Sequence, residues 1–159
     1  MSDKACEYFK RSFFAIDGLW FMMNEDDSSF EKALMIDEQV WKVLSKIQSR
    51  KLRELYEIKG NSLRDLLFAL EIKLELEGYK FTIEKISDNN AQILIQNCPW
   101  FDIMLKAGRE KFAGRVGEKI CDVEYKGWTN SFDNKIKFNL GLQLCRGEKM
   151  CQLKFQLKS

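Results

Sequence analysis

The sequence predicts a single α+β domain over residues 1–159, with long amino-terminal helices packed on an antiparallel sheet that is built from two hairpins with a helical excursion between them. Apolar side chains recur three and four positions apart through the first half of the chain, which is typical of helices with one buried face. Two regions further on show strand-like alternation with turn-forming residues between the runs. The 159 residues and the 45% hydrophobic fraction suit one packed core.

Two long helices and a shorter one are expected first. Residues 4–23 carry large apolar groups at helical spacing, and the acidic segment 24–27 is expected to break the helix. Ser28 with Glu31 is a capping-box pattern that predicts a second helix, which runs to about residue 56 or 58. The segment Lys59-Gly60-Asn61 ends that helix.

A third helix and a first hairpin are expected next. Ser62 and Asp65 can cap the helix, and Gly78 is placed as its stop. Alternation over 79–84 and 91–96, on either side of Asp88-Asn89-Asn90, predicts two paired strands.

The second half is predicted to hold a helical excursion and a second hairpin. Pro99 favours a helix start there, while Gly108, Gly114 and Gly117 predict two short helical pieces after it. The segment Cys121–Tyr125 fits a short helix or a strand. Alternation from Ser131 to Leu144 predicts a strand whose partner, 151–157, follows a turn at 146–149.

Composition excludes several classes of function. The net charge is +2 with both signs interleaved, so no basic stripe indicates a nucleic-acid partner. The amino terminus lacks a secretory pattern, and the longest apolar run, 13–23, is too short to span a membrane and contains Asp17. We therefore expect a cytoplasmic protein with reduced thiols. Histidine is absent, which excludes Ser-His-Asp and Cys-His catalytic pairs and any histidine-bearing zinc site.

Four of the five cysteines, Cys98, Cys121, Cys145 and Cys151, are candidate metal ligands. Four thiolates suit structural zinc or an iron–sulfur cluster. Cys145 and Cys151 bracket a Gly-Glu turn, but no pair has the tight spacing of two intervening residues. The competing interpretation is that these cysteines simply pack in the core, as free cysteines commonly do.

Cys98 is also a candidate nucleophile, because it precedes the helix predicted at Pro99 and a helix amino terminus lowers a thiol pKa. In a chain without histidine, a carboxylate such as Asp102 or Glu124, or a lysine, must act as the base. A small apolar residue that ends a strand is the simpler interpretation.

A ligand site is predicted where acids flank apolar helix faces. Asp17 and Asp37 stand in similar surroundings, and large aromatic side chains recur on the same helices. Such a stripe most often forms core, but it also suits a pocket for a planar apolar molecule. The candidate ligand-binding residues are Asp17, Trp20, Asp37, Trp41 and Trp100.

The closing pattern of Cys145, Gly147-Glu148, Cys151 and Phe155 resembles the end of the 4-vinyl reductase-like domains and of the related L-2-amino-thiazoline-4-carboxylic acid hydrolase-like proteins. The front of the chain is similar to an uncharacterised archaeal and bacterial branch of that group. The residues that carry this second likeness are Asp17-Gly18-Leu19-Trp20-Phe21, Ala33, Asp37 and Val40-Trp41.

This resemblance implies a pocket for an aromatic effector and a nearby zinc held by cysteines and a glutamate. It assigns Cys121, Cys145 and Cys151 as ligands. The glutamate position of the family is occupied here by Leu142, so we expect Cys98 to take its place. The interval between the last two cysteines is also two residues shorter than in the family. The resemblance further implies a homodimer formed through the amino-terminal helices.

Three hypotheses follow. The first is a cytoplasmic small-molecule-binding domain with a cysteine-ligated metal at Cys98, Cys121, Cys145 and Cys151. The second is a cysteine-dependent C–N hydrolase that resembles the thiazoline-carboxylate enzymes, with Cys98 or Cys121 as nucleophile and Asp102 or Glu124 as proton carrier. The third is a structural subunit that dimerises through its helices.

Overall fold

The computed structural model describes residues 3–158 and confirms the predicted α+β class. Helices come first, and a four-stranded antiparallel sheet is formed by two strand pairs with helices between them. The chain divides into two compact units, Met1–Val40 and Trp41–Ser159, and the boundary lies within the second helix. The prediction of a single domain stays a prediction. No helix among the described residues is long and apolar enough to cross a membrane.

The first unit contains α1 (Asp3–Asp27) and the beginning of α2 (Phe30–Leu55). The predicted break at residues 24–27 is wrong, because α1 continues through this acidic segment. The Ser28 hydroxyl donates to the Asn24 carbonyl at 2.7 Å and so belongs to the end of α1. Ser29 instead accepts the Lys32 N–H at 3.2 Å, so the second helix is capped one residue later than predicted.

The second unit starts within α2 and continues with α3 (Leu63–Glu77). The predicted capping box is confirmed, because the Ser62 hydroxyl accepts the Asp65 N–H while the Asp65 carboxylate accepts the Ser62 N–H at 2.9 Å. Gly78 ends the helix with φ 83°, in the left-handed region that glycine tolerates.

The sheet has the strand order β1-β2-β4-β3. Its strands are β1 (Lys80–Ser87), β2 (Asn90–Asn97), β3 (Ile136–Leu140) and β4 (Cys151–Leu157). The two hairpins are joined where β2 pairs with β4, with Ile95 opposite Cys151. This pairing places the amino-terminal end of β4 beside the end of β2.

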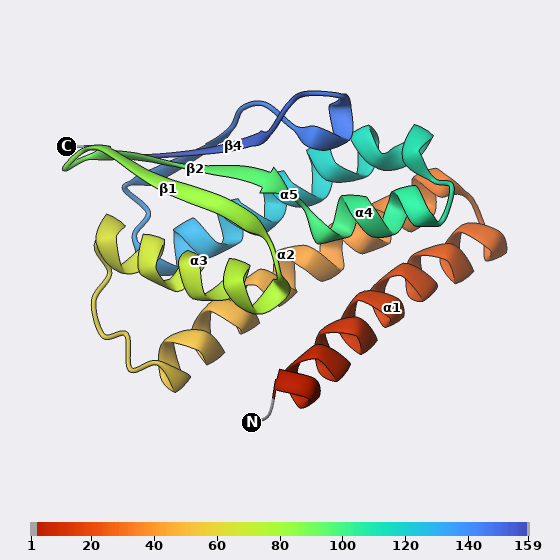
Figure 1. The fold of residues 1–159 in the computed structure, drawn as a ribbon, viewed down its shortest axis with the longest axis horizontal. Helices are drawn as coiled ribbons and strands as arrows, with labels where there is room; N and C mark the ends of the chain where they lie inside the picture. The colour runs from red at the N-terminus through yellow and green to blue at the C-terminus, as the bar shows by residue number, and fades with distance from the viewer. Residues whose placement is uncertain (1–2, 159) are drawn as a thin grey trace. The chain divides into compact units, whose positions relative to one another are not determined.

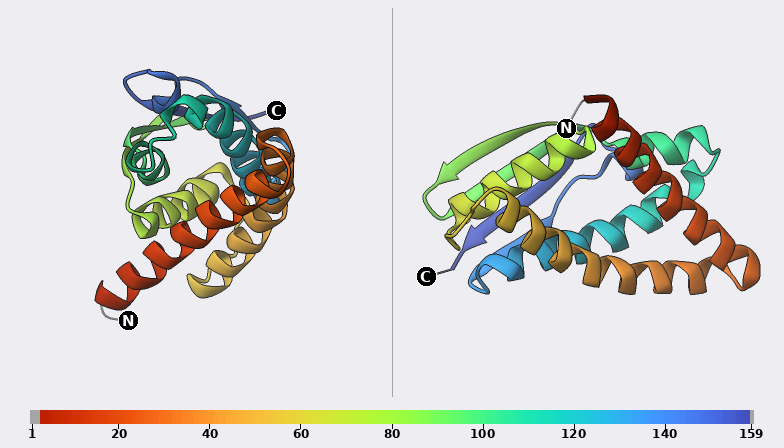
Figure 2. Two further views of the ribbon diagram at one scale, coloured as in Figure 1. Left: turned by 90° about the vertical axis from the view of Figure 1, so that its right-hand side faces the viewer. Right: turned by 90° about the horizontal axis from the view of Figure 1, so that it is seen from below.

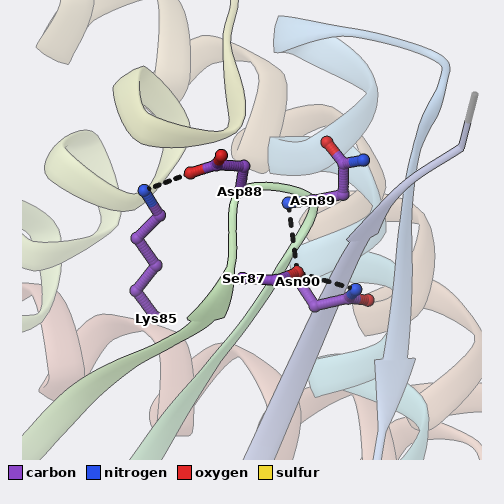
Figure 3. A network of polar contacts seen from close by, with 5 residues as sticks. All are labelled: Lys85, Ser87, Asp88, Asn89 and Asn90. Atoms are coloured by element: carbon purple, nitrogen blue, oxygen red, sulfur yellow. Dashed lines mark hydrogen bonds and ion pairs between the residues drawn. The ribbon is translucent and has the colours of Figure 1, made fainter.

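The turn between β1 and β2 is held by short-range polar contacts (Figure 3). The Lys85 ammonium contacts the Asp88 carboxylate at 2.7 Å. The Ser87 hydroxyl accepts from the Asn89 N–H at 3.3 Å and from the Asn90 side-chain amide at 3.0 Å. These are the contacts expected of turn-forming Ser, Asp and Asn residues, and they confirm the first predicted hairpin.

The helical excursion consists of α4 (Pro99–Lys106) and α5 (Glu110–Phe132). Pro99 begins α4 as predicted. The prediction of two short pieces broken by glycines is wrong after Gly108, because α5 runs without interruption through Gly114 and Gly117. These glycines serve close packing instead. A Cβ on Gly117 would lie only 2.5 Å from Cys145 Sγ.

The last strand pair is shorter than predicted. Residues from Ser131 to Phe132 complete α5, so β3 begins only at Ile136. A 3-10 turn, η1 (Leu144–Arg146), then replaces the end of the expected strand. Gly147 follows with φ 86°, which lets the chain return toward β4.

Figures 1 and 2 show α3 and α5 lying along one face of the sheet. The core of this unit contains Leu66, Leu70 and Leu74 from α3, Trp128 from α5, and apolar side chains of β2, β3 and β4. Leu52 near the end of α2 joins the same core. Alternate residues of β4 are buried, from Cys151 to Phe155, as expected for a sheet covered on one face.

Gly127 on α5 tests the close contact between α5 and α2. A Cβ at this position would overlap the hydroxyl of fully buried Ser45, so we expect Gly127→Ala to lower the free energy of unfolding by about 1–3 kcal/mol. Gly18→Ala is the control, because a Cβ there meets nothing within 4 Å, and we expect it to be neutral or to stabilise by up to about 1 kcal/mol. Urea unfolding followed by circular dichroism measures both. Equal stability of Gly127→Ala and the parent protein would contradict this packing.

Candidate functional site

Four cysteines from four separate segments of the chain lie at one end of the sheet. Cys98 precedes α4, Cys121 lies in α5, Cys145 lies in η1, and Cys151 begins β4. All four carry free thiols. Cys6, the fifth cysteine, belongs to the first unit and lies in α1.

The thiols of these four residues are electrostatic neighbours. Burial raises the pKa of Cys121 well above its usual value, and charge on Cys98, Glu124, Cys151 or Cys145 raises it further. Such coupling requires proximity, since charge interactions fall off with distance. The sequence alone could not place these residues together. We refer to Cys98, Cys121, Cys145 and Cys151 as the cysteine cluster.

Burial makes the thiols of the cluster harder to deprotonate. It raises the pKa of Cys98, Cys145 and Cys151 to about 11 in each case. Hydrogen bonding from the Phe101 backbone and from the Tyr79 hydroxyl acts in the opposite direction at Cys98 but does not overcome burial. The Leu144 N–H donates to Cys151 Sγ at 3.3 Å, so one sulfur already accepts a backbone hydrogen bond.

Glycines on α5 allow the loop that carries Cys145 to approach closely. A Cβ on Gly114 would lie 3.3 Å from the Cys145 carbonyl oxygen, and one on Gly117 would lie 2.5 Å from its Sγ. The buried side-chain amide of Gln143 also lies against Gly117, with Nε2 3.7 Å from the same Cβ position. Larger residues at these positions would push the loop away from α5.

A buried ion network lies beside the cluster. The Lys73 ammonium on α3 contacts the carboxylates of Glu77 and Glu124 at 2.8 Å each, and all three side chains are at least nine-tenths buried. Burial acts to lower the pKa of Lys73, but the charges of Glu124 and Glu77 outweigh it and raise the pKa. The network thereby ties α3 to α5.

Tyr79 connects this network to the cluster. Its ring lies 5.8 Å from the Lys73 ammonium, and its hydroxyl hydrogen-bonds to Cys98. Burial raises the pKa of Tyr79 well above its usual value, and charge on Cys98 adds to this rise, so its phenol stays protonated and able to donate. Tyr79 also lines an open groove of about 560 Å³ with residues of α3 and β1, including Glu71, Glu75 and Phe81.

The donor set of the cluster suits a soft metal ion, but its spacing is not that of a coordination shell. Four sulfurs without histidine match zinc or an iron–sulfur cluster in ligand type. Within residues 3–158, however, no three Cys, Asp or Glu side chains are arranged to hold a metal ion. The thiols must therefore move closer together to bind one.

The predicted ligand-binding residues fall in both units. Trp41 and Trp100 pack edge to face, with ring centroids 5.4 Å apart, and Trp41 is buried. Asp17 and Trp20 lie on α1, and Asp37 lies on the part of α2 that belongs to the first unit. Trp20 is exposed. The structure thus brings together one predicted pair, and the roles of Asp17, Trp20 and Asp37 stay predictions.

The two carboxylates expected to serve a cysteine nucleophile have partners of their own. Asp102 accepts a hydrogen bond from the Asn97 side-chain amide at 2.8 Å, and Glu124 is ion-paired with Lys73. The thiols of Cys98 and Cys121 have raised pKa values, whereas a reactive cysteine usually has a lowered one. These surroundings are unlike those of a reactive cysteine.

Four residues beside the cluster were not predicted. Lys73 and Glu77 are a lysine–glutamate pair four positions apart, which in a sequence indicates an exposed helix face. Gln143 lies in a segment that was predicted to be a strand. Tyr79 was expected only to begin the first strand, although its place directly after Gly78 does put it at the edge of a turn.

The state of the thiols can be tested by alkylation. A pKa of about 11 in place of 9.0 leaves about a hundredfold less thiolate at neutral pH, and the thiolate is the reacting species. We expect Cys98, Cys145 and Cys151 to react with iodoacetamide at pH 7.5 at least about a hundredfold more slowly in the folded metal-free protein than in guanidinium. The rates should rise with pH up to about 11. Peptide mass spectrometry assigns each site, and one cluster thiol that reacts fast at neutral pH would contradict this description.

Comparison with known proteins places the chain without assigning it an activity. No curated protein matches the sequence. A family model does match over residues 4–155, nearly the whole chain, and its description is a family of unknown function, DUF6125. The resemblance to the 4-vinyl reductase-like group stays a prediction. The chain belongs to the DUF6125 family.

Proposed function

We propose that the chain is a cytoplasmic small-molecule-binding domain in which the cysteine cluster binds one soft metal centre, zinc or an iron–sulfur cluster. The observation that carries this proposal is the convergence of four free thiols from four separate segments of the chain. Four thiolates match the ligand number and type of a closed zinc or iron–sulfur site.

Backbone and side-chain donors around the sulfurs support the proposal. The Leu144 N–H already donates to Cys151, and the Tyr79 hydroxyl and the Phe101 backbone favour the thiolate of Cys98. Hydrogen bonds of this kind orient metal ligands and adjust their basicity. Binding would release the thiol protons and draw the sulfurs together, so affinity should increase with pH.

Small-molecule binding is supported by the groove at Tyr79. The groove, at about 560 Å³, is large enough to admit a small organic ligand, and its lining includes the charged side chains of Glu71, Glu75 and Lys80. Tyr79 both lines this groove and hydrogen-bonds to Cys98, so a ligand there would be linked to the state of the cluster. An aromatic effector, as the resemblance implies, would suit the aromatic side chains of Tyr79 and Phe81.

The metal proposal is tested by the metal content of the purified chain. We expect close to one zinc per chain, or iron with a charge-transfer absorption band, after anaerobic purification. Replacing both Cys145 and Cys151 with Ser should abolish binding, because removing two of four ligands leaves too few for a closed site. Cys6→Ser is the matched control, since Cys6 lies in the other unit, and it should retain the metal.

Two results would overturn this proposal. One is a chain that remains metal-free when reconstituted with zinc or with iron and sulfide under reducing conditions. The other is a Cys145→Ser, Cys151→Ser variant that binds as much metal as the parent. Metal-free protein with one thiol that reacts much faster than the others would instead favour the cysteine hydrolase.

We further propose that the chain forms a homodimer through α1. Large apolar side chains occupy one face of this helix, and each is more than half exposed: Tyr8 67%, Phe9 60%, Ile16 62%, Leu19 55%, Trp20 68% and Met23 52%. Contiguous apolar surface of this kind is uncommon on a monomer and marks interaction sites. The same face would suit a purely structural subunit, for which the cysteines would not matter.

Sedimentation velocity tests the dimer. We expect Ile16→Glu with Trp20→Glu to convert a dimer to a monomer, because two carboxylates would be buried without partners in the interface. Lys4→Glu changes charge on α1 outside the apolar face and should leave the dimer intact. A parent protein that is monomeric at micromolar concentration, or a double variant that still dimerises, would contradict the proposal. If the Ile16→Glu, Trp20→Glu variant lost metal binding as well as dimerisation, the metal site would depend on the dimer.

A further inference from the structure

The outer side of β1 is an unpaired strand edge. Within residues 3–158, β1 pairs with β2 on one side and with no strand on the other, and Figure 1 shows it at the side of the sheet. A strand edge of this kind presents a row of backbone N–H and C=O groups that can pair with another chain. β1 therefore has hydrogen-bonding groups available to an extended partner.

The groove at Tyr79 lies along this edge, between β1 and α3. Tyr79, Phe81 and Ile83 form its apolar side, and all three side chains are partly buried. Glu71 and Glu75 form its acidic side on α3, which runs alongside β1 in Figures 1 and 2. Because successive side chains of a strand point to opposite faces of a sheet, a strand added to β1 would direct every second side chain toward the groove.

The spacing of the two glutamates matches the repeat of an extended chain. They are four residues apart on α3, so they are separated by about 6 Å along the helix axis. Alternate residues of a strand, which share one face, are about 6.7 Å apart. Two basic side chains with one residue between them therefore have nearly the same spacing as the two carboxylates.

Both carboxylates are available for such contacts. Glu71 and Glu75 are exposed, and neither forms an ion pair with another of the residues that the structure describes. Lys80 also lines the groove, so two carboxylates and one ammonium leave it with a net negative charge. A lysine or arginine of a partner could pack its aliphatic part on Phe81 or Ile83 and extend its charged end to a glutamate.

We propose that the groove between α3 and β1 binds an extended peptide segment of a partner protein, with Lys or Arg at alternate positions, as a strand added to the edge of β1. Backbone pairing supplies the affinity, and the two glutamates select the basic residues. This inference goes beyond the proposed small-molecule site, because a small aromatic ligand uses neither the strand edge nor the spacing of Glu71 and Glu75. It requires no metal at the cysteine cluster.

Fluorescence anisotropy with labelled peptides tests the inference on the full chain. We expect an eight-residue peptide in which Lys alternates with Thr to bind saturably at low salt, with a dissociation constant below about 1 mM. A peptide with the same composition but with its lysines in succession should bind more weakly, because only alternate lysines face the two glutamates together. A peptide in which Glu replaces Lys should bind more weakly still.

Glutamine substitutions test the part of the two carboxylates. Glu71→Gln with Glu75→Gln should weaken binding of the alternating peptide about 3–30-fold, which is the effect of losing two exposed ion pairs. The difference should shrink at high salt, where exposed charges are screened. Glu54→Gln with Glu148→Gln is the control, because it changes the net charge equally at exposed residues that do not line the groove.

Methylation of peptide amides separates strand addition from simple attraction of a basic peptide. A strand that pairs along one edge uses the N–H groups of alternate residues. Methylation of one alternate set should therefore abolish binding, while methylation of the other set should leave it unchanged.

Three results would overturn the inference: no saturable binding of the alternating peptide, equal binding by the Glu71→Gln, Glu75→Gln variant, or equal effects of the two methylation patterns. Binding of a small aromatic compound in place of the peptide would also overturn it and leave the small-molecule proposal standing. The zinc content of the same sample bears only on the cysteine cluster, so failure of one proposal is distinguishable from failure of the other.

Discussion

The close approach of the η1 loop to the glycine face of α5 is the constraint on which the cysteine site depends. Gly114 and Gly117 leave room for the carbonyl and the sulfur of Cys145, and a side chain at Gly117 would displace that sulfur. Since Cys151 begins β4 directly after this loop and Cys121 lies one turn beyond Gly117, the same contact brings three of the four thiols together. The pairing of β2 with β4 supplies Cys98, because Ile95 lies opposite Cys151.

The site also depends on the burial of charged and ionisable side chains. Lys73 is held between Glu77 and Glu124, and this network fixes α3 against α5 next to Cys121. Burial of the four thiols raises their pKa values, which lowers the fraction of nucleophilic thiolate in the absence of metal. A divalent cation would reverse this preference, because it stabilises thiolates directly.

Much of the fold could be predicted from local pattern, and the site only in part. The helix periodicity, the capping box at Ser62 and the turn at residues 88–90 are local signals, so they indicated α3 and the first hairpin correctly. The prediction of a helix broken at Gly114 and Gly117 was wrong because, in a sequence, a glycine that permits close packing looks the same as one that ends a helix. The choice of the four cysteines as a set could be made from residue type and resemblance. Their convergence depends on long-range packing that no local pattern reports. The same is true of the positions of Lys73, Tyr79 and Gln143 beside them.

X-ray absorption at the metal edge tests the central claim most directly, because it reports which atoms surround the metal. For the zinc-loaded chain we predict a shell of four sulfur atoms at about 2.3 Å, without nitrogen ligands, since the chain has no histidine. Loss of sulfur from that shell in Cys145→Ser would connect the shell to the cluster. A shell dominated by oxygen at about 2.0 Å would contradict the account, because it would show that zinc binds surface carboxylates and not the four cysteines.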